Sequence, residues 1–148
     1  MRALIQRVTR ASVTVDGQVV GSCERGYLIF LGVGHGDSEE QVEQLWSKVS
    51  RLRIFEDENG KINRSLADIE GDVLVVSQFT LYATCKRGNR PSFTCAAPPD
   101  EARRLYEAFA DRARRDVARV ETGEFGAMMS VELVNDGPFT IWLDTDEL

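Results

Sequence analysis

The residues best placed to do chemistry are four consecutive ones, Ser77-Gln78-Phe79-Thr80, which follow an apolar run. Two hydroxyls and an amide at the end of a buried strand favour a pocket, because strand ends are where such sites are built. A serine-hydrolase nucleophile is not indicated, since Val75 and Phe79 occupy the glycine positions of a Gly-x-Ser-x-Gly turn. The alternative is that both hydroxyls only satisfy hydrogen bonds at a sheet edge.

The single histidine restricts the conventional mechanisms. Any Ser-His or Cys-His pair would have to use His35, which lies in the run Gly32-Val33-Gly34-His35-Gly36-Asp37. Asp37 replaces the third glycine of a dinucleotide-binding loop and would repel a pyrophosphate, so we interpret this run as a strand-to-helix turn. The three cysteines form no Cys-x-x-Cys pair, and we expect no metal site and no cofactor.

A second pattern stands near the end of the chain. The segment Asn135-Asp136-Gly137-Pro138-Phe139-Thr140 separates two strand-like runs, Met128–Val134 and Phe139–Leu143. Gly137 can adopt backbone angles closed to other residues, and a cis peptide before proline costs only about 0.5–1 kcal/mol over trans. The pair is therefore either a plain hairpin turn or a rigid element that directs backbone carbonyls outward.

Composition limits the class of protein. With 148 residues, of which 43% are hydrophobic, we expect one domain spanning 1–148. No apolar run approaches the ~20 residues of a membrane span, so we expect a cytoplasmic protein without a membrane partner. The net charge of −6 argues against general nucleic-acid binding, and an RNA partner would need a local basic patch. Lys86, Arg87 and Arg90 form one candidate patch, although such a cluster taken alone is more typical of a solvated loop.

The elements that must position these residues follow from hydrophobic spacing and turn signals. Strands are predicted at Ala3–Val15 and Gln18–Ser22 around an Asp16-Gly17 turn, and at Tyr27–Val33 and Asp72–Leu81. One helix is predicted from a cap at Asp37 or Ser38 to Leu52, and a second from Pro99 to about Val117. Its interleaved arginines and acids predict a salt-bridged outer face between Arg103 and Arg119. This order predicts an α+β fold with a mixed or antiparallel, barrel-like sheet and two main helices.

Together, the two motifs resemble the signature motifs of the D-aminoacyl-tRNA deacylases. The first resemblance is carried by Ser77-Gln78-Phe79-Thr80-Leu81 and the second by Asn135 to Thr140. Three further segments are similar to that family: Leu4–Val13, Arg90–Phe93 and Phe125–Met129. The resemblance thus extends over nearly the whole chain.

This resemblance implies a homodimer that hydrolyses the ester joining a D-amino acid, or glycine, to the 3′ end of tRNA. It implies that the Gly137-Pro138 peptide is cis and reaches from one subunit into the site of the other, where it excludes L side chains. Ser77, Gln78, Phe79 and Thr80 would form the catalytic wall, with Met129 nearby and Arg7 supporting the Gly-Pro segment. Phe139 stands where the family more usually has valine.

The resemblance also implies where the missing base comes from, because the 2′-hydroxyl of the terminal adenosine is expected to assist attack by water. The protein would supply positioning and oxyanion stabilisation, for which the backbone N–H groups around Phe79 and Thr80 are candidates. Two other functions remain open. One is a non-catalytic RNA-binding module that uses Lys86, Arg87 and Arg90, and the other is a small-molecule esterase with Ser77 or Thr80 as nucleophile.

Overall fold

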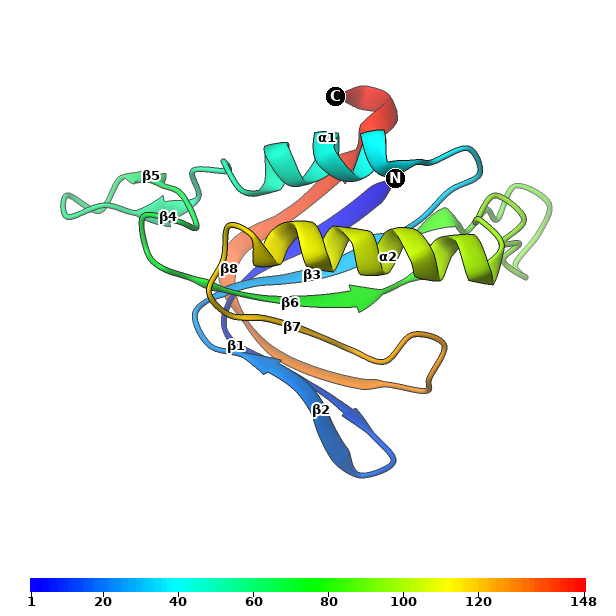
Figure 1. Ribbon diagram of the computed structural model, residues 1–148, viewed down its shortest axis with the longest axis horizontal. Helices are drawn as coiled ribbons and strands as arrows, with labels where there is room; N and C mark the ends of the chain where they lie inside the picture. The colour runs from blue at the N-terminus through cyan, green and yellow to red at the C-terminus, as the bar shows by residue number, and fades with distance from the viewer.

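The computed structural model describes residues 1–148 and has one main sheet at its centre. The strand order is β2-β1-β3-β6-β7, and β8 also pairs with β1. Two helices lie side by side across one face of this sheet, and both termini lie beside the first helix (Figure 1). The strands of this sheet are β1 Arg2–Val15, β2 Gln18–Cys23, β3 Gly26–Gly32, β6 Asp72–Ser77, β7 Val120–Thr122 and β8 Ser130–Asp144. The other elements are α1 Glu39–Val49, α2 Pro99–Arg114, the hairpin β4 Phe55–Glu56 and β5 Ile62–Arg64, and the 3₁₀ turns η1 Phe79–Tyr82 and η2 Thr145–Glu147.

The sheet is mixed and curls toward closure. β3 pairs with β6, and β6 with β7, in parallel, whereas β1 pairs antiparallel with β2, β3 and β8. The far strands also meet, because the Ser22 N–H donates to Glu121 Oε1 at 3.0 Å. A Cβ added at Gly21 would lie 2.2 Å from the Thr122 carbonyl oxygen, so only glycine permits this approach. The predicted α+β class, with a barrel-like sheet and two main helices, is confirmed.

The larger of two core clusters lies between the helices and the sheet, and the smaller one is formed by residues of the sheet strands alone. Each helix buries one face of apolar residues at helical spacing, and removal of this surface from water is the main stabilising contribution. Trp46 of α1 packs edge-on against Phe109 of α2 with ring centroids 5.7 Å apart, and its indole N–H donates to Asp116 at 2.8 Å. Ser38 caps α1, as one of the two predicted candidates. The buried helix residues are Val42, Leu45, Trp46, Val49, Ala102, Leu105, Tyr106, Phe109, Ala110 and Ala113.

Some of the predicted salt bridges within α2 are present. Two other salt bridges of α2 arginines join this helix to α1. Arg104 pairs with Glu39, and Arg112 pairs with Glu43 at 2.8 Å, so α2 is bound to α1 at its charged edge. Within or just beyond α2, Arg112 contacts Asp116 and Arg114 contacts Asp111. No helix of the protein combines the length and apolarity that a membrane crossing requires.

Several predicted boundaries were wrong. β6 ends at Ser77 and does not continue to Leu81, because its partner β3 ends at Gly32 and the last ladder bond joins the Gln78 N–H to the Leu31 carbonyl. The chain then turns into η1. The helices are also shorter than predicted and exclude Leu52 and Val117. Strands β4, β5 and β7 were not predicted, since two or three residues carry no readable alternation.

The two strand-like runs predicted around Gly137-Pro138 are one strand, β8, interrupted by a bulge. Asn135 pairs with Val8 and Thr140 pairs with Gln6, so residues 136–139 of β8 stand opposite Arg7 alone. The chain therefore does not reverse at the Gly-Pro pair, and the hairpin-turn interpretation is wrong. Extra residues in one strand of a pair are forced out of the ladder, and such bulges are common next to functional sites.

Candidate functional site

A cavity of about 880 Å³ opens at the end of β6. The predicted segment Ser77 to Thr80 forms one part of its wall, and the segment Phe125–Met129 forms another. The remaining wall comes from the loop after β3, the loop that precedes α2, the first turn of α2, and Val131 of β8. Most of the lining is apolar, and such a cavity with few polar groups is typical of an organic ligand site. Tertiary structure thus brings together two segments that are about 50 residues apart in the chain.

The turn η1 presents two free backbone donors beside this cavity. In and beside the turn, the Leu81 N–H donates to the Gln78 carbonyl and the Ala83 N–H to the Thr80 carbonyl. The N–H groups of Phe79 and Thr80 donate to no acceptor of the chain, as is usual for the first residues of a helical turn. Two adjacent free N–H groups can stabilise a negatively charged oxygen.

The side chains of the same wall do not form a nucleophile–base pair. The Thr80 hydroxyl accepts a hydrogen bond from the Gln78 amide, which is not a base. His35 also lines the cavity, but its Nε2 lies 2.9 Å from the Thr94 carbonyl oxygen. Phe79 instead packs edge-on against Phe93, with centroids 5.1 Å apart. The geometry therefore favours binding and charge stabilisation over covalent catalysis.

The bulge of β8 is held by Arg7, whose side chain is buried. Arg7 Nε lies 3.0 Å from the Asp136 carbonyl oxygen and 3.1 Å from Asp136 Oδ2, and another guanidinium nitrogen donates to the Ile54 carbonyl. Asn135 closes the base of the bulge, because its side-chain amide donates to the carbonyls of Arg7 and Phe139 at 3.0 and 3.1 Å. Gly137 and Pro138 are exposed beyond these contacts, and the peptide bond between them is cis.

Two aromatic rings fix the Arg7 guanidinium. Its central carbon lies 4.3 Å from the Phe139 ring centroid and 5.9 Å from that of Phe55. A cation over an aromatic face contributes roughly 0.5–2 kcal/mol. Phe139 therefore packs directly against Arg7, the residue that supports the bulge. This is the position at which the resemblance led us to expect valine.

The bulge does not reach the cavity of its own chain. Val131, the β8 residue in the cavity wall, pairs with Val13, whereas the bulge lies opposite Arg7. Positions 13 and 7 of β1 are six residues apart, which is roughly 20 Å of extended chain. Neither Gly137 nor Pro138 lines the cavity.

Of the other predicted site residues, Met129 lines the cavity, whereas the basic residues lie outside it. Lys86, Arg87 and Arg90 are exposed on the loop between Tyr82 and Phe93, and none of them has an acidic partner. Sequence reasoning did not find Arg2, Ile54 or Phe55. None of these three lies in a motif, and their roles come from contacts with segments that are distant in the chain.

Comparison with known proteins identifies the family to which this chain is similar. Residues 4–144 match the family described as D-Tyr-tRNA(Tyr) deacylase. A D-aminoacyl-tRNA deacylase of Thermotoga petrophila is 59% identical over 148 residues, which covers 100% of this chain and 99% of that protein. A D-aminoacyl-tRNA deacylase of Thermomicrobium roseum is 60% identical over 148 residues, with 100% and 96% coverage.

Solved structures agree with this fold. A structure titled c-Myc DNA Unwinding Element Binding Protein has a TM-score of 0.92 and 40% identity, and the match covers 98% of this chain and 99% of that one. A probable eukaryotic D-amino acid tRNA deacylase has a TM-score of 0.80 at 20% identity, over 96% and 97% of the two chains, and supports the fold alone. Fold and sequence together define the chain as one of the deacylase class of α+β proteins. More narrowly, it belongs to the D-Tyr-tRNA(Tyr) deacylase family.

The contacts of Arg7 predict a large loss of stability on its replacement. Arg7→Met leaves the Ile54 carbonyl and Asp136 without their donor, and we expect unfolding to become easier by about 2–3 kcal/mol, because Asp136 is partly exposed. The measurement is urea unfolding. Arg10→Met is the matched control, since Arg10 pairs with Glu132 in the same two strands but on the surface, and should cost less than about 0.5 kcal/mol. Equal losses in both variants would contradict the assignment.

Proposed function

We propose that this protein hydrolyses the ester bond of D-aminoacyl-tRNA, releasing free tRNA and the D-amino acid. The single observation that carries the proposal is the pair of free N–H groups, on Phe79 and Thr80, beside an apolar cavity in a member of this family. The volume of about 880 Å³ is within the range that takes a drug-sized ligand, and thus suits a terminal adenosine with its aminoacyl group.

The reaction proceeds by attack of water on the ester carbonyl carbon. The carbonyl oxygen becomes negatively charged and accepts hydrogen bonds from the Phe79 and Thr80 N–H groups, which stabilise the transition state. The 2′-hydroxyl of the terminal adenosine assists removal of the water proton. The bond to the ribose 3′ oxygen then breaks, and that oxygen takes up the proton that the attacking water has lost, relayed through the 2′-hydroxyl. This route needs no side-chain base, in keeping with a Thr80 hydroxyl that is bound only to an amide.

Selectivity for the D configuration is assigned to Gly137 and Pro138 of a second copy of the chain. Enantiomers have equal polarity and volume, so only a stiff obstacle near the α-carbon can distinguish them. The anchoring of Asp136 by Arg7 supports such stiffness. Glycine has no side chain to exclude, and glycyl-tRNA is therefore an expected second substrate.

A homodimer supplies the obstacle that one chain lacks. The bulge lies roughly 20 Å along β8 from the cavity of its own chain, too far to touch a ligand bound there. Phe79 and Met128 are 54% and 93% exposed where they line the cavity, and an apolar rim of this kind favours cover by another protein surface.

The exposed loop residues Lys86, Arg87 and Arg90 are assigned to the phosphates of the tRNA. We assign the protein to the cytoplasm, in keeping with a tRNA substrate.

The proposed activity predicts turnover of D-tyrosyl-tRNA with L-tyrosyl-tRNA spared. We expect a difference in kcat/KM of at least about 100-fold, which corresponds to about 2.7 kcal/mol in the transition state. Release of labelled amino acid from the two substrates is the measurement. Binding of tRNA without turnover of either ester, at any protein concentration, would leave the RNA-binding module as the function.

Assistance by the substrate predicts that a tRNA ending in 2′-deoxyadenosine is cleaved at least about 10-fold more slowly. Ser77→Ala and Thr80→Ala are the companion variants, and at least one of them should retain turnover, because neither hydroxyl has a base beside it. Full-speed cleavage of the deoxy substrate, with loss of activity in both variants, would instead indicate an esterase with a side-chain nucleophile.

Sharing of the site between subunits predicts complementation in a mixed dimer. Ala127→Trp fills the cavity, and Pro138→Glu puts a charge on the bulge that an apolar cavity rejects, so each homodimer should be inactive. A heterodimer isolated with two affinity tags contains one intact cavity and, from the other chain, one intact bulge. We expect about half of the wild-type rate per dimer. An inactive heterodimer would place the bulge and the cavity of one chain in the same site.

A further inference from the structure

The turn η1 has little to hold it in place by itself. None of its four residues is buried, and no side chain caps its start. Segments with few buried apolar contacts open easily, so the position of such a turn depends on contacts from outside. Its position matters because the same turn carries the free N–H groups of Phe79 and Thr80.

Arg2 supplies these outside contacts from the beginning of β1. One guanidinium nitrogen donates to the Leu81 carbonyl at 3.0 Å, and the central carbon lies 4.3 Å from the centroid of the Tyr82 ring. Trp142 of β8 lies on the same guanidinium, with its centroid at 5.6 Å. Arg2 thus binds the second half of η1 through both a hydrogen bond and an aromatic contact.

The position of Arg2 is itself determined by a polar network at the chain ends. Arg2 Nε donates to Asp144 Oδ2 at 2.8 Å, and the buried Asp144 also accepts from the Asp146 N–H at 3.1 Å. Burial alone would raise the pKa of Asp144, but the hydrogen bonds from Asp146 and Arg2 outweigh it and lower this pKa. The carboxylate is therefore ionised at neutral pH and keeps Arg2 in place.

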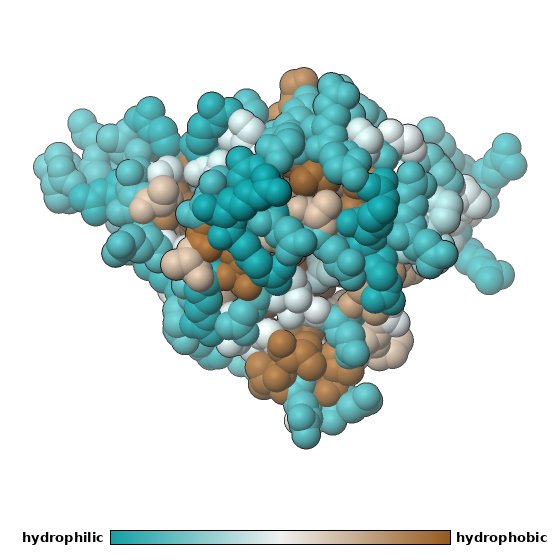
Figure 2. All heavy atoms as spheres, viewed as in Figure 1, coloured by the Kyte–Doolittle hydropathy of each residue, from teal (hydrophilic) through white to brown (hydrophobic).

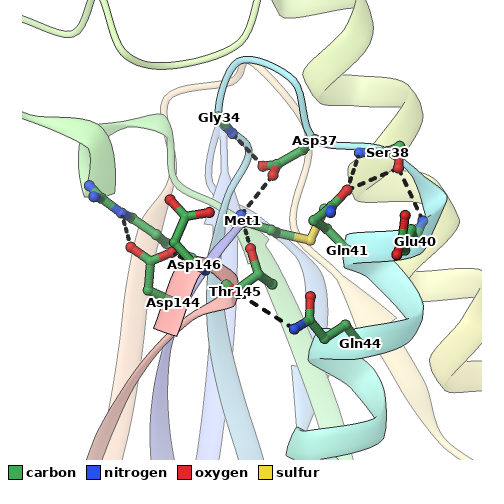
Figure 3. A network of polar contacts seen from close by, with 11 residues as sticks. Met1, Gly34, Asp37, Ser38, Glu40, Gln41, Gln44, Asp144, Thr145 and Asp146 are labelled. Atoms are coloured by element: carbon green, nitrogen blue, oxygen red, sulfur yellow. Dashed lines mark hydrogen bonds and ion pairs between the residues drawn. The ribbon is translucent and has the colours of Figure 1, made fainter. Parts of the chain in front are cut away.

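The Met1 amino group joins the chain ends to the loop that follows β3, which contains Gly34 and Asp37 (Figure 3). The Met1 amino group donates to Thr145 Oγ1 at 2.6 Å and to Asp37 Oδ1 at 2.8 Å, and Asp37 Oδ2 accepts the Gly34 N–H at 2.7 Å. Gly34 lies directly against Tyr82, since an added Cβ would be 2.7 Å or less from the ring and its hydroxyl. Tyr82, the last residue of the turn, therefore has both Gly34 and the Arg2 guanidinium against its ring.

We propose that Arg2 is a positioning residue for the deacylation reaction, because it holds Leu81 and Tyr82 and thereby keeps the free N–H groups of Phe79 and Thr80 in place beside the cavity. The inference rests on the proposed function. It goes beyond it by assigning a role to a residue outside both motifs and outside the cavity wall. A lysine at this position can pair with Asp144, but it lacks the planar fork that binds a carboxylate and a carbonyl together.

Arg2→Lys and Arg2→Met test this role, with Arg10→Met as the control in the same strand. Steady-state cleavage of D-tyrosyl-tRNA is measured over a range of substrate concentrations, well below the unfolding midpoint of each variant. A displaced turn should lower kcat by about 10- to 100-fold in both Arg2 variants with KM within about twofold, because oxyanion donors act in the transition state. Arg10→Met should cleave at the wild-type rate, since its ion pair with Glu132 is exposed and distant from η1.

A second measurement separates positioning from stability. Amide hydrogen exchange of Phe79 to Tyr82 should rise in the Arg2→Lys variant, while its urea midpoint remains near that of the wild type, because the pair with Asp144 is kept. Wild-type kcat in Arg2→Lys, or a kcat that falls only in proportion to lost stability, would overturn the inference. Absence of cleavage by the wild-type protein would instead overturn the proposed function.

Discussion

The pairing of β1 with β8 is the interaction on which the rest of the structure depends. β1 is shared along its length, with β3 beside its first half, β2 beside its second half, and β8 along nearly all of it. Because residues 136–139 of β8 have only Arg7 opposite them, the excess chain must leave the ladder. The same pairing sets Asp144 opposite Arg2 at the end of the strand. One ladder therefore positions both the bulge and the arginine that contacts η1.

Charge is used locally in this acidic protein. Arg2 and Arg7 donate their hydrogen bonds to carbonyls and carboxylates of their own chain, and the guanidinium of each lies over an aromatic ring. Most arginines of α2 are paired with acids. The basic residues of the loop at 86–90 have no such partners and are free for an anionic ligand.

Exposed apolar side chains also gather near the tip of the β1–β2 hairpin, where Val19 and Val20 are exposed (Figure 2).

Much of the fold was predictable because it rests on local patterns. The spacing of Val42, Leu45, Trp46 and Val49 specifies a helix with one buried face, and the Asp16-Gly17 pair specifies a hairpin. Both motifs of the site could also be found from sequence, by their resemblance to one family. The failures share a cause. The end of β6 depends on where its partner strand β3 ends. The bulge in β8 depends on how many residues of β1 lie opposite it. Neither property can be deduced from the sequence of the segment itself.

The sequence by itself determined the two helices, strands β1, β2, β3 and β6, the two motifs, and the restriction of any histidine-based mechanism to His35, since these follow from residue identity and spacing. Only tertiary structure decided how the motifs relate. It placed Ser77 to Thr80 beside Phe125–Met129 around one cavity and put Gly137 and Pro138 far from it. It also assigned Arg2 and Arg7 to carbonyls about 80 and 130 positions away. The physical reason is that strand register and side-chain contacts join distant segments, and a pattern read along the chain contains no information about distance through space.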